Sequence, residues 1–449
     1  MLSWRLNLKF KLHLKQVTGL LMALASMATT YWLWSQPAAL GSDDAFYFSN
    51  GIEHFSVLEF SPHFPGYPAF ISLARLASLF LDDATQALIS TTRLAALLIP
   101  WLSYALLRAS GCQQSYAAVG FLLCAGQPLL LGLGLQGLSD SAGLIWLLAL
   151  LLTLQRNHLY LAGLMLGLLL ATRPSYAPLI VAPLCWILYL EPRRLLQLLP
   201  GGLIIGLLSL GFVLYHDSSA YFYEGWRFIQ GHFQLWGNSS LGTVQSGSWS
   251  ESLTDYFGSC LALVVLAIPV LWLIWRQRTP ETILLLVTFI FSLVWTLGAQ
   301  NPLNLRHMAP SLILLICLLC IALSRLHIRK LSIILSIFLF TGGLIQTLSL
   351  MEWQPKQPPL QQARIWLEQQ STGQLATNYG VDLLRHQLPT FAVADTYYPG
   401  ASKRVLQSGG WRLSATQLND DSLVMKQQFS ARFPGEQSLW IYQYKIDIY

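Results

Sequence analysis

The sequence Gly41-Ser42-Asp43-Asp44-Ala45-Phe46-Tyr47 places two adjacent carboxylates directly after a strongly apolar segment, residues 16–34. The segment Ser61-Pro62-His63-Phe64-Pro65-Gly66-Tyr67-Pro68 follows in the same polar stretch. Charge is scarce elsewhere, because 11% of the residues are charged and 54% are hydrophobic, whereas a soluble domain carries about 25% charged residues. Continuous apolar runs close to the length of a membrane span therefore predict an all-α polytopic membrane protein.

The positions of the basic residues predict how the helices cross the membrane. The segment 67–81 is short for a span and ends in Asp82-Asp83, so we expect it to lie along the outer leaflet. Each inner loop then carries Arg, often clustered, and the outer loops carry the Asp residues and isolated Arg residues, which is the positive-inside asymmetry. A crossing at 67–81 would invert every later loop. The apolar run before Tyr31-Trp32-Leu33-Trp34 has the charge pattern of a signal peptide but ends in an aromatic belt, so we expect an uncleaved helix with a cytoplasmic N-terminus. About eleven spans are expected, at 16–34, 91–107, 115–134, 142–155, 159–172, 175–190, 195–215, 259–275, 280–297, 308–323 and 331–350.

A change in composition divides the chain into two predicted domains. Residues 1–351 form the membrane domain, with a first outer loop at 35–90 and a long outer loop at 216–258. Residues 352–449 begin with a Pro- and Gln-rich linker and are predicted to form a small α+β domain on the outer face. In this tail we expect a helix at 361–370 and strands at 375–378 and 438–442, and we find no catalytic pattern.

Several functional classes are excluded by composition. The net charge of +6 comes from Lys and Arg in short loops, where they orient helices, so no nucleic-acid partner is expected. Six cysteines give no disulfide framework. Cys317 and Cys320 share a helix face, for which packing is a better explanation than metal binding. The chain has no Gly-rich phosphate loop, zinc motif or nucleophile elbow, which argues against a nucleotide sugar used from the cytoplasm.

The acidic pair is the strongest candidate for chemistry. A carboxylate beside the membrane can take a proton from an acceptor hydroxyl or amine, and a second one can orient the first or bind a divalent cation. The alternative is a solvated loop acid or a cap for a helix starting near Ala45. Asp140, between two predicted spans, is a third acidic candidate, and its alternative is again a helix cap.

At this point the sequence resembles a family. Asp43-Asp44-Ala45-Phe46-Tyr47 is similar to the Asp-Glu-x-x-Tyr motif in the first outer loop of GT-C superfamily glycosyltransferases, and His63 to Pro68 resembles the segment that follows it. This superfamily includes lipid A aminoarabinose transferases and protein O-mannosyltransferase-like proteins of the family 39 type. The resemblance implies many membrane helices, helices along the membrane in the first outer loop, and a polyprenyl-phosphate sugar as donor. Asp44 departs from the motif, because Glu is usual there.

The resemblance also suggests roles for individual residues. Asp43 would be the general base, and Asp140 matches an acidic residue of the second outer loop. Arg173 and Arg306 would bind the lipid phosphate, and the alternative for an arginine at a helix end is contact with lipid headgroups, which is the role we expect for Arg93. Further candidates for substrate contacts, each with a structural alternative, are His63, Tyr67, His307, Glu224 and Arg227, and Asp44 and Asp140 are the candidates for a divalent cation.

Taken together, the sequence predicts an inverting glycosyltransferase in a bacterial inner membrane, with an outward-facing C-terminal domain. The donor would be a polyprenyl-phosphate sugar and the acceptor a lipid, glycan or protein of the cell envelope. One alternative is a lipid or polysaccharide transporter, for which polar residues near the middle of several spans would be expected. Another is an O-antigen polymerase or ligase, which would act from a larger late loop.

Overall fold

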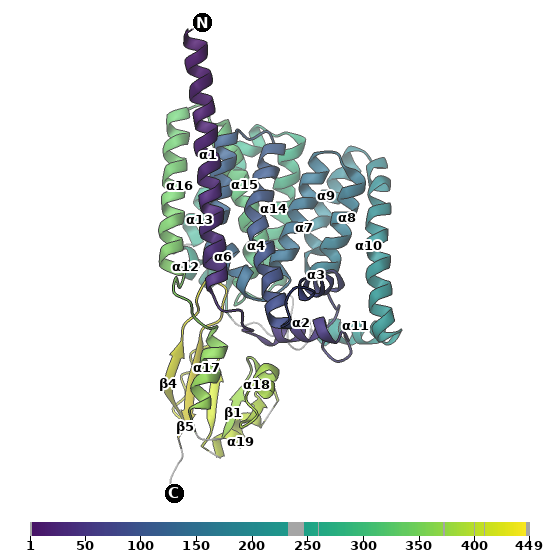
Figure 1. Cartoon of the computed structure of the whole chain (residues 1–449), viewed down its shortest axis with the longest axis vertical. Coiled ribbons are helices and arrows are strands. Elements are labelled where there is room, and N and C mark those ends of the chain that lie inside the picture. Colours follow the sequence, from purple (N-terminus) through teal and green to yellow (C-terminus); the bar gives the residue numbers. More distant parts are fainter. Residues whose placement is uncertain are drawn as a thin grey trace.

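The computed structural model describes residues 2–231, 247–258, 260–370, 373–398, 400–407 and 409–445. A layer of roughly parallel helices carries a small domain with a sheet at one end, and the N-terminus of α1 projects from the opposite end (Figure 1). The helices of this layer are α1 (Leu2–Ser35), α4 (Ala84–Ala109), α5 (Gln114–Ala125), α6 (Pro128–Gly132), α7 (Asp140–Gln155), α8 (Leu159–Thr172), α9 (Ala177–Leu190), α10 (Arg193–Asp217), α13 (Cys260–Arg276), α14 (Pro280–Ala299), α15 (Ala309–Arg325) and α16 (Arg329–Leu350).

Several of these helices can cross a membrane. Within the part of the chain that the structure describes, six helices are long and apolar enough, or seven if α5 and the segment 128–135, which bend by 55°, count as one span. The helices α7, α8 and the segment 174–190 are apolar but shorter. A polytopic helical membrane protein is therefore confirmed, while the number of about eleven spans stays a prediction.

Short helices cover the end of the layer that faces the small domain. They are α2 (Asp43–Glu53), α3 (Pro68–Ser78), α11 (Ala220–Gly231) and α12 (Trp249–Phe257). With 11 residues, α3 is about 16 Å long and far short of a bilayer of about 30 Å, in agreement with the prediction for 67–81. The residues 232–246 of the long outer loop lie outside the described part of the chain.

The acidic residues at the starts of α2 and α7 do not act as the helix caps that the alternative interpretation predicted. In α2 the cap is Ser42, whose Oγ accepts a hydrogen bond from the amide of Ala45 at 3.3 Å. Asp43 and Asp44 occupy the first turn. Asp140 is the first residue of α7, and no side chain caps that helix. All three carboxylates are therefore available for contacts outside their own helices.

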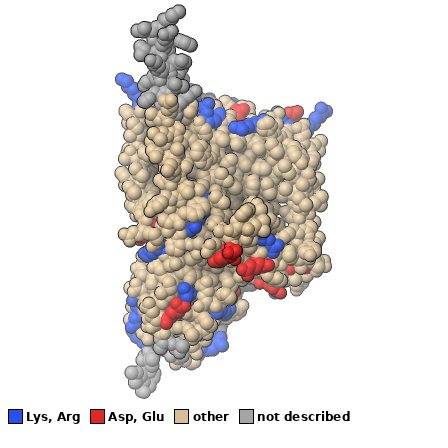
Figure 2. Space-filling view, in the orientation of Figure 1, with Lys and Arg blue, Asp and Glu red and all other residues tan. Residues whose placement is uncertain are grey.

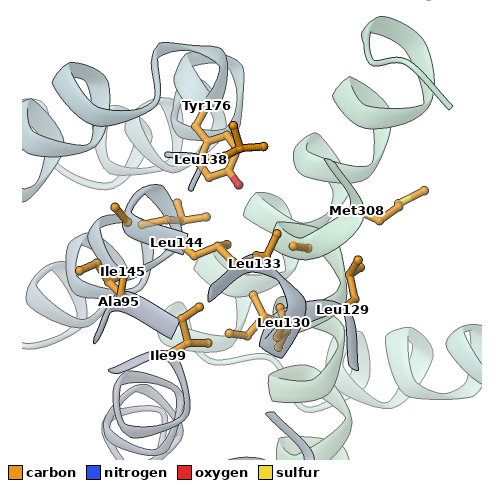
Figure 3. Packing of buried hydrophobic residues seen from close by; sticks show 14 of the residues in the cluster. Ala95, Ile99, Leu129, Leu130, Leu133, Leu138, Leu144, Ile145, Tyr176 and Met308 are labelled. Carbon is orange, nitrogen blue, oxygen red and sulfur yellow. The ribbon is translucent and has the colours of Figure 1, made fainter. Parts of the chain in front are cut away.

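Close contacts between helices and one extended apolar core hold the helical layer together and join it to the short helices and the small domain. A Cβ at Gly163 would lie 2.0 Å from the carbonyl oxygen of Leu198, so α8 and α10 approach as closely as small residues allow. Leu144, Leu133 and Tyr176, from three different segments, lie close together in the interior (Figure 3). The same apolar cluster continues through Phe48 of α2 into the small domain.

The small domain contains a five-stranded mixed sheet with strand order β2-β1-β3-β5-β4. The strand β1 is parallel to both neighbours, and β5 is antiparallel to both of its own. The helix expected at 361–370 and the strands expected at 375–378 and 438–442 correspond to α17, β1 and β5. The elements are α17 (Pro359–Glu368), β1 (Gln374–Thr377), α18 (Val381–Gln387), β2 (Ala392–Asp395), α19 (Ala401–Gln407), β3 (Trp411–Ser414), β4 (Leu423–Phe429) and β5 (Leu439–Tyr444).

Charged residues are distributed unevenly over the surface. Lys and Arg side chains line the end of the helical layer nearest the N-terminus, and a group of Asp and Glu side chains lies near the small domain (Figure 2). Arg93 differs from its predicted role as a headgroup anchor. Its side chain is buried in α4, donates to the carbonyl of Gln36 at 2.7 Å and lies 5.6 Å from the ring of Trp34. It therefore joins α4 to the end of α1.

Candidate active site beneath the C-terminal domain

Four charged side chains of alternating sign form a chain at the outer end of the helical layer. Nη2 of Arg173 lies 2.8 Å from Oδ1 of Asp140, and Nε of Arg306 lies 3.8 Å from Oδ2 of the same carboxylate. Nη2 of Arg306 also lies 3.8 Å from Oδ2 of Asp44. The structure thus brings together four of the predicted residues, from four separate segments of the chain.

Local backbone features set these positions. Asp44 belongs to the first turn of α2, and Asp140 begins α7. Arg173 lies at the break between α8 and the 3₁₀ turn η2 (Pro174–Tyr176), where Nη1 donates to Oγ of Ser139 at 3.2 Å. Arg306 belongs to the 3₁₀ turn η4 (Leu305–Met308) that precedes α15. Each charged group therefore sits where a helix starts or stops, at the edge of the apolar layer.

Gly143 makes room for Arg173. A Cβ at Gly143 would lie 2.8 Å from the Cβ of Arg173, closer than two such atoms approach in real structures. Gly143 is one turn after Asp140 on α7, so the same helix supplies both the counter-charge and the space for the arginine. The absence of a side chain at Gly143 is thus part of how the site is built.

The charged chain is mostly buried but incompletely hydrogen-bonded. Side-chain exposure is 1% for Asp140, 10% for Arg173 and 17% for Arg306, and rises to 47% for Asp44. The Nε atoms of both arginines are buried, and neither has a hydrogen-bond partner among the residues described. Buried donors are normally satisfied, so these two guanidinium groups have donors to offer to an anionic ligand.

Asp43 points elsewhere, toward the C-terminal domain. Its Oδ2 accepts from the amide of Val381 at 2.9 Å, and its Oδ1 accepts from the amides of Asp382 and Leu383, each at 3.0 Å. Burial raises the pKa of Asp43 from 3.8 to about 6, and the hydrogen bond from Leu383 opposes that shift. Asp382 and Asp44, both acidic, raise the pKa further. A carboxyl group with a pKa near 6 is ionised at neutral pH yet basic enough to accept a proton.

A cavity of about 210 Å³ lies between the first outer loop and the C-terminal domain. Its membrane-side wall contains Asp43, Asp44 and Arg306, and its opposite wall is formed by the tail. A cavity of this size accommodates part of a small polar ligand. Its remaining lining residues are Gly41, Ser42, Leu135, Gln136, Leu138, Asn304, Asn378, Tyr379, Gly380, Arg432, Gly435, Glu436 and Gln437.

His63 and Tyr67 form a pair next to the charged chain. Nε2 of His63 lies 3.1 Å from Oη of Tyr67, and the imidazole stacks on the ring of Phe228. Burial raises the pKa of Tyr67 to about 12, while the charges of Arg173 and Arg306 lower it and those of the two nearby aspartates raise it. The phenol of Tyr67 therefore stays protonated and can donate a hydrogen bond within the site.

Of the predicted site residues, Asp43, Asp44 and Arg306 line the cavity. Its lining does not include His63, Tyr67, Asp140, Arg173, Glu224, Arg227 or His307. Glu224 and Arg227 pair with each other on α11, at 2.8 Å between Oε1 and Nη2. His307 belongs to η4 and lines a separate void of about 10 Å³, and its carbonyl accepts from Oγ1 of Thr296. His232 and Trp236, in the same outer loop as Glu224, lie outside the described residues. The cavity lining therefore gives no support to a role in substrate binding for Glu224, Arg227 or His307.

Solved structures with a similar architecture are known. ArnT from Cupriavidus metallidurans in the apo state matches with a TM-score of 0.58 and 14% identity, over 94% of this chain and 97% of that chain. The same protein bound to undecaprenyl phosphate matches with a TM-score of 0.56 and 13% identity, over the same shares. This chain has the GT-C fold.

A third GT-C structure extends the likeness. The archaeal oligosaccharyltransferase AglB from Archaeoglobus fulgidus, in complex with an inhibitory peptide and a dolichol-phosphate, matches with a TM-score of 0.52 and 13% identity. The match covers 89% of this chain and 69% of that chain. At the level of sequence, neither a family model nor a curated protein matches. The likeness at these identities concerns the fold.

Sequence reasoning missed two residues that hold the first outer loop in place. Asp217, at the end of α10, accepts from Oγ of Ser56 at 2.8 Å and from the amide of Val57 at 2.7 Å, and so clamps the first outer loop. Tyr379 of the tail donates from Oη to the carbonyl of Gly41 at 3.1 Å. No local pattern marks either residue, because the partners lie far away in sequence.

The predicted cation site does not fit the arrangement of Asp44 and Asp140. Both carboxylates face Arg306, whose positive charge occupies the position a cation would take. Among the described residues, no group of three or more His, Cys, Asp or Glu side chains is placed to hold a metal ion. We therefore derive no step through a metal in this site, and the divalent cation stays a prediction. Cys317 and Cys320 are buried in α15, where they pack.

Proposed function

We propose that this protein is a membrane glycosyltransferase that moves a sugar from a polyprenyl-phosphate carrier to an acceptor on the outer face of the membrane. The observation that carries the proposal is the convergence of Asp43, Asp44 and Arg306 on one cavity at the outer end of a GT-C fold. A base and a phosphate-binding cation side by side are what glycosyl transfer from a lipid phosphate requires.

In the proposed reaction an acceptor hydroxyl oxygen attacks the anomeric carbon of the donor sugar. Asp43 takes the hydroxyl proton as the new glycosidic bond forms, and the bond from the anomeric carbon to the phosphate oxygen breaks. A carboxylate offers about four acceptor positions, and three are used by backbone amides, so one remains on Oδ2 of Asp43. Displacement in one step inverts the anomeric centre.

The departing lipid phosphate carries away the bonding electron pair and needs stabilisation. Arg306 and Arg173 are suited to this role, because each has a buried Nε that makes no hydrogen bond to the described residues. Guanidinium groups bind phosphate oxygens bidentately, and in a water-poor site such bonds stabilise developing charge strongly. Asp140 lies between the two arginines and sets their spacing.

The compared structures support the class of donor. ArnT was solved bound to undecaprenyl phosphate, and AglB was solved with a dolichol-phosphate. Both ligands are polyprenyl phosphates, the class proposed here. The acceptor would be a lipid, glycan or protein of the cell envelope.

The surface charge supports a location in the bacterial inner membrane with the N-terminus in the cytoplasm. Lys and Arg side chains gather at the end of the helical layer from which α1 projects. A group of Asp and Glu side chains lies at the other end, beside the C-terminal domain, which carries Lys and Arg as well (Figure 2). By the positive-inside rule the basic end faces the cytoplasm. Reporter fusions after Asp82 and after the tail test this orientation, and a cytoplasmic tail would overturn it.

The direct test of the function is transfer from radiolabelled polyprenyl-phosphate sugars in membranes that contain the protein. We expect transfer by the native chain and a loss of at least about a hundredfold for Asp43→Asn. Asp82→Asn is the matched control, because Asp82 is an exposed outer aspartate that does not line the cavity. Undiminished transfer by Asp43→Asn would refute the base assignment, and movement of intact lipid-linked sugar without transfer would favour the transporter alternative.

A further inference from the structure

The contact between Asp43 and α18 joins the C-terminal domain to the reacting end of the site. We propose that the C-terminal domain is a working part of the catalytic site and that α18 positions Asp43, held there by a latch between Tyr47 and Asp382. Tyr47 and Asp382 are in this view positioning residues. This inference rests on the proposed function of Asp43.

The first step in the argument is that α18 and Asp43 complete each other. The N-cap residue of α18 is Gly380, in the left-handed conformation with φ +67, and a glycine has no side chain with which to cap the helix. The first three amides of α18 instead donate to Asp43, from a segment on the other side of the domain boundary. The first amides of a helix need outside acceptors, and here a carboxylate of the membrane domain supplies them.

The second step concerns the geometry of the carboxylate. Three hydrogen bonds, one to Oδ2 and two to Oδ1, fix both the position of Asp43 and the rotation of its carboxylate plane. A general base must lie within hydrogen-bond reach of the proton it accepts, in a fixed direction. The side chain of Asp44 is half exposed, and its contact is the ion pair with Arg306 rather than the amides of α18. The C-terminal domain therefore orders one member of the acidic pair and not the other.

The third step identifies what holds α18 in place. Oη of Tyr47 donates a hydrogen bond to Oδ2 of Asp382, whose other oxygen accepts from Arg385 at 2.9 Å. Asp43 and Tyr47 are four residues apart on α2 and therefore lie on the same face of that helix. One face of α2 thus supplies both the group that is positioned and the group that secures its partner.

Further contacts make the docking of the domain extensive. Nε2 of Gln361 donates to the carbonyl of Leu40 at 2.9 Å, and Tyr379 bonds to Gly41, so the residues just before α2 are held as well. Leu383 of α18 belongs to the same apolar cluster as Phe48 of α2. The tail also forms one wall of the cavity that holds Asp43. Removal of the latch alone should therefore loosen α18 without releasing the whole domain.

The test compares latch variants by steady-state transfer kinetics in the full-length protein. Tyr47→Phe keeps the ring and removes only the donor, and we expect kcat to fall about tenfold with the KM for the donor unchanged. Asp382→Ala should do the same, whereas Asp382→Asn keeps an acceptor oxygen and should restore most of kcat. Both changes remove the same bond between Tyr47 and Asp382, and Asp382→Ala also removes the ion pair with Arg385. Tyr47→Phe combined with Asp382→Ala should therefore be no worse than Asp382→Ala alone.

Arg385→Gln is the matched control, because it breaks the exposed ion pair on the same helix without touching α2. It should leave kcat within about twofold of the native value. An unchanged kcat in Tyr47→Phe would overturn the proposal, and an increased kcat would show that the docked domain inhibits the enzyme rather than completing it. Multiplying effects in the double variant would also overturn it.

Hydrogen exchange gives a readout that does not depend on activity. In the native protein the amides of residues 381–383 should exchange slowly, and Asp43→Ala should accelerate them while amides in β5 stay unchanged. Unaltered exchange in Asp43→Ala would overturn the contact itself. If Asp43→Ala accelerates exchange but the native protein transfers no sugar, the contact is supported and the proposed function is refuted. The two failures are therefore distinguishable.

Discussion

Replacement of Asp140 by Asn tests the charged chain most directly. The side chain of Asp140 is 1% exposed, with Arg173 at 2.8 Å and Arg306 at 3.8 Å. Asn cannot neutralise either guanidinium. Arg173 would keep its bond to Ser139 and its contact with the ring of Tyr176, and Arg306 its distant ion pair with Asp44. Removal of one partner from a buried ion pair costs about 3–5 kcal/mol. We expect the free energy of unfolding to fall by about this amount.

The measurement is unfolding in detergent micelles, followed by tryptophan fluorescence, for Asp140→Asn, Arg173→Gln and the double variant. Since the double variant leaves no unpaired charge between these two positions, it should be more stable than the sum of the single losses predicts, by about 1–3 kcal/mol. Asp82→Asn, at an exposed position, should change stability by less than about 0.5 kcal/mol. A loss below about 1 kcal/mol in Asp140→Asn, or strict additivity, would refute the ion-pair reasoning.

Three further outcomes are expected. Transfer should rise with pH through about 6 and level off above it, because Asp43 must lose its proton to act as base; a profile flat from pH 5 to 8 would contradict this assignment. Gly143→Ala should lower transfer about tenfold or more by displacing Arg173, while Gly206→Ala, where a Cβ would meet nothing within 4 Å, should have no effect; equal effects would refute the steric argument. EDTA should leave transfer unchanged because Arg306 faces both candidate carboxylates, and a loss restored by Mg²⁺ would reinstate the cation.

The fold class followed from local signals. Apolar runs separated by loops with basic residues predict membrane helices. This prediction needs only the local sequence and no knowledge of which residues are neighbours in space. The short segment before Asp82 was separated from the spans by length and charge, and α3 is indeed short. The strand at 438–442 was visible in the same way, from its β-branched and aromatic residues. These predictions depend on composition over a few turns of chain.

The site was predicted in part. The acidic pair and its two arginines were found because charge at the end of an apolar helix is costly and therefore conspicuous. Sequence did not separate the roles of Asp43 and Asp44, since adjacent residues of a helix point in directions about 100° apart and only packing shows what each direction meets. Arg93 was assigned to the headgroups for the same reason, although it is buried against Gln36.

The sequence by itself determined that Asp43 and Asp44 stand beside a membrane helix, on the same predicted face as Asp140, Arg173 and Arg306. Only the tertiary structure decided that Asp44 joins the arginine chain while Asp43 is held by the amides of residues 381–383. The bonds that hold Asp43 join residues 338 to 340 positions apart. Backbone amides carry no side-chain signature, so their contribution to the site exists only once the C-terminal domain has docked.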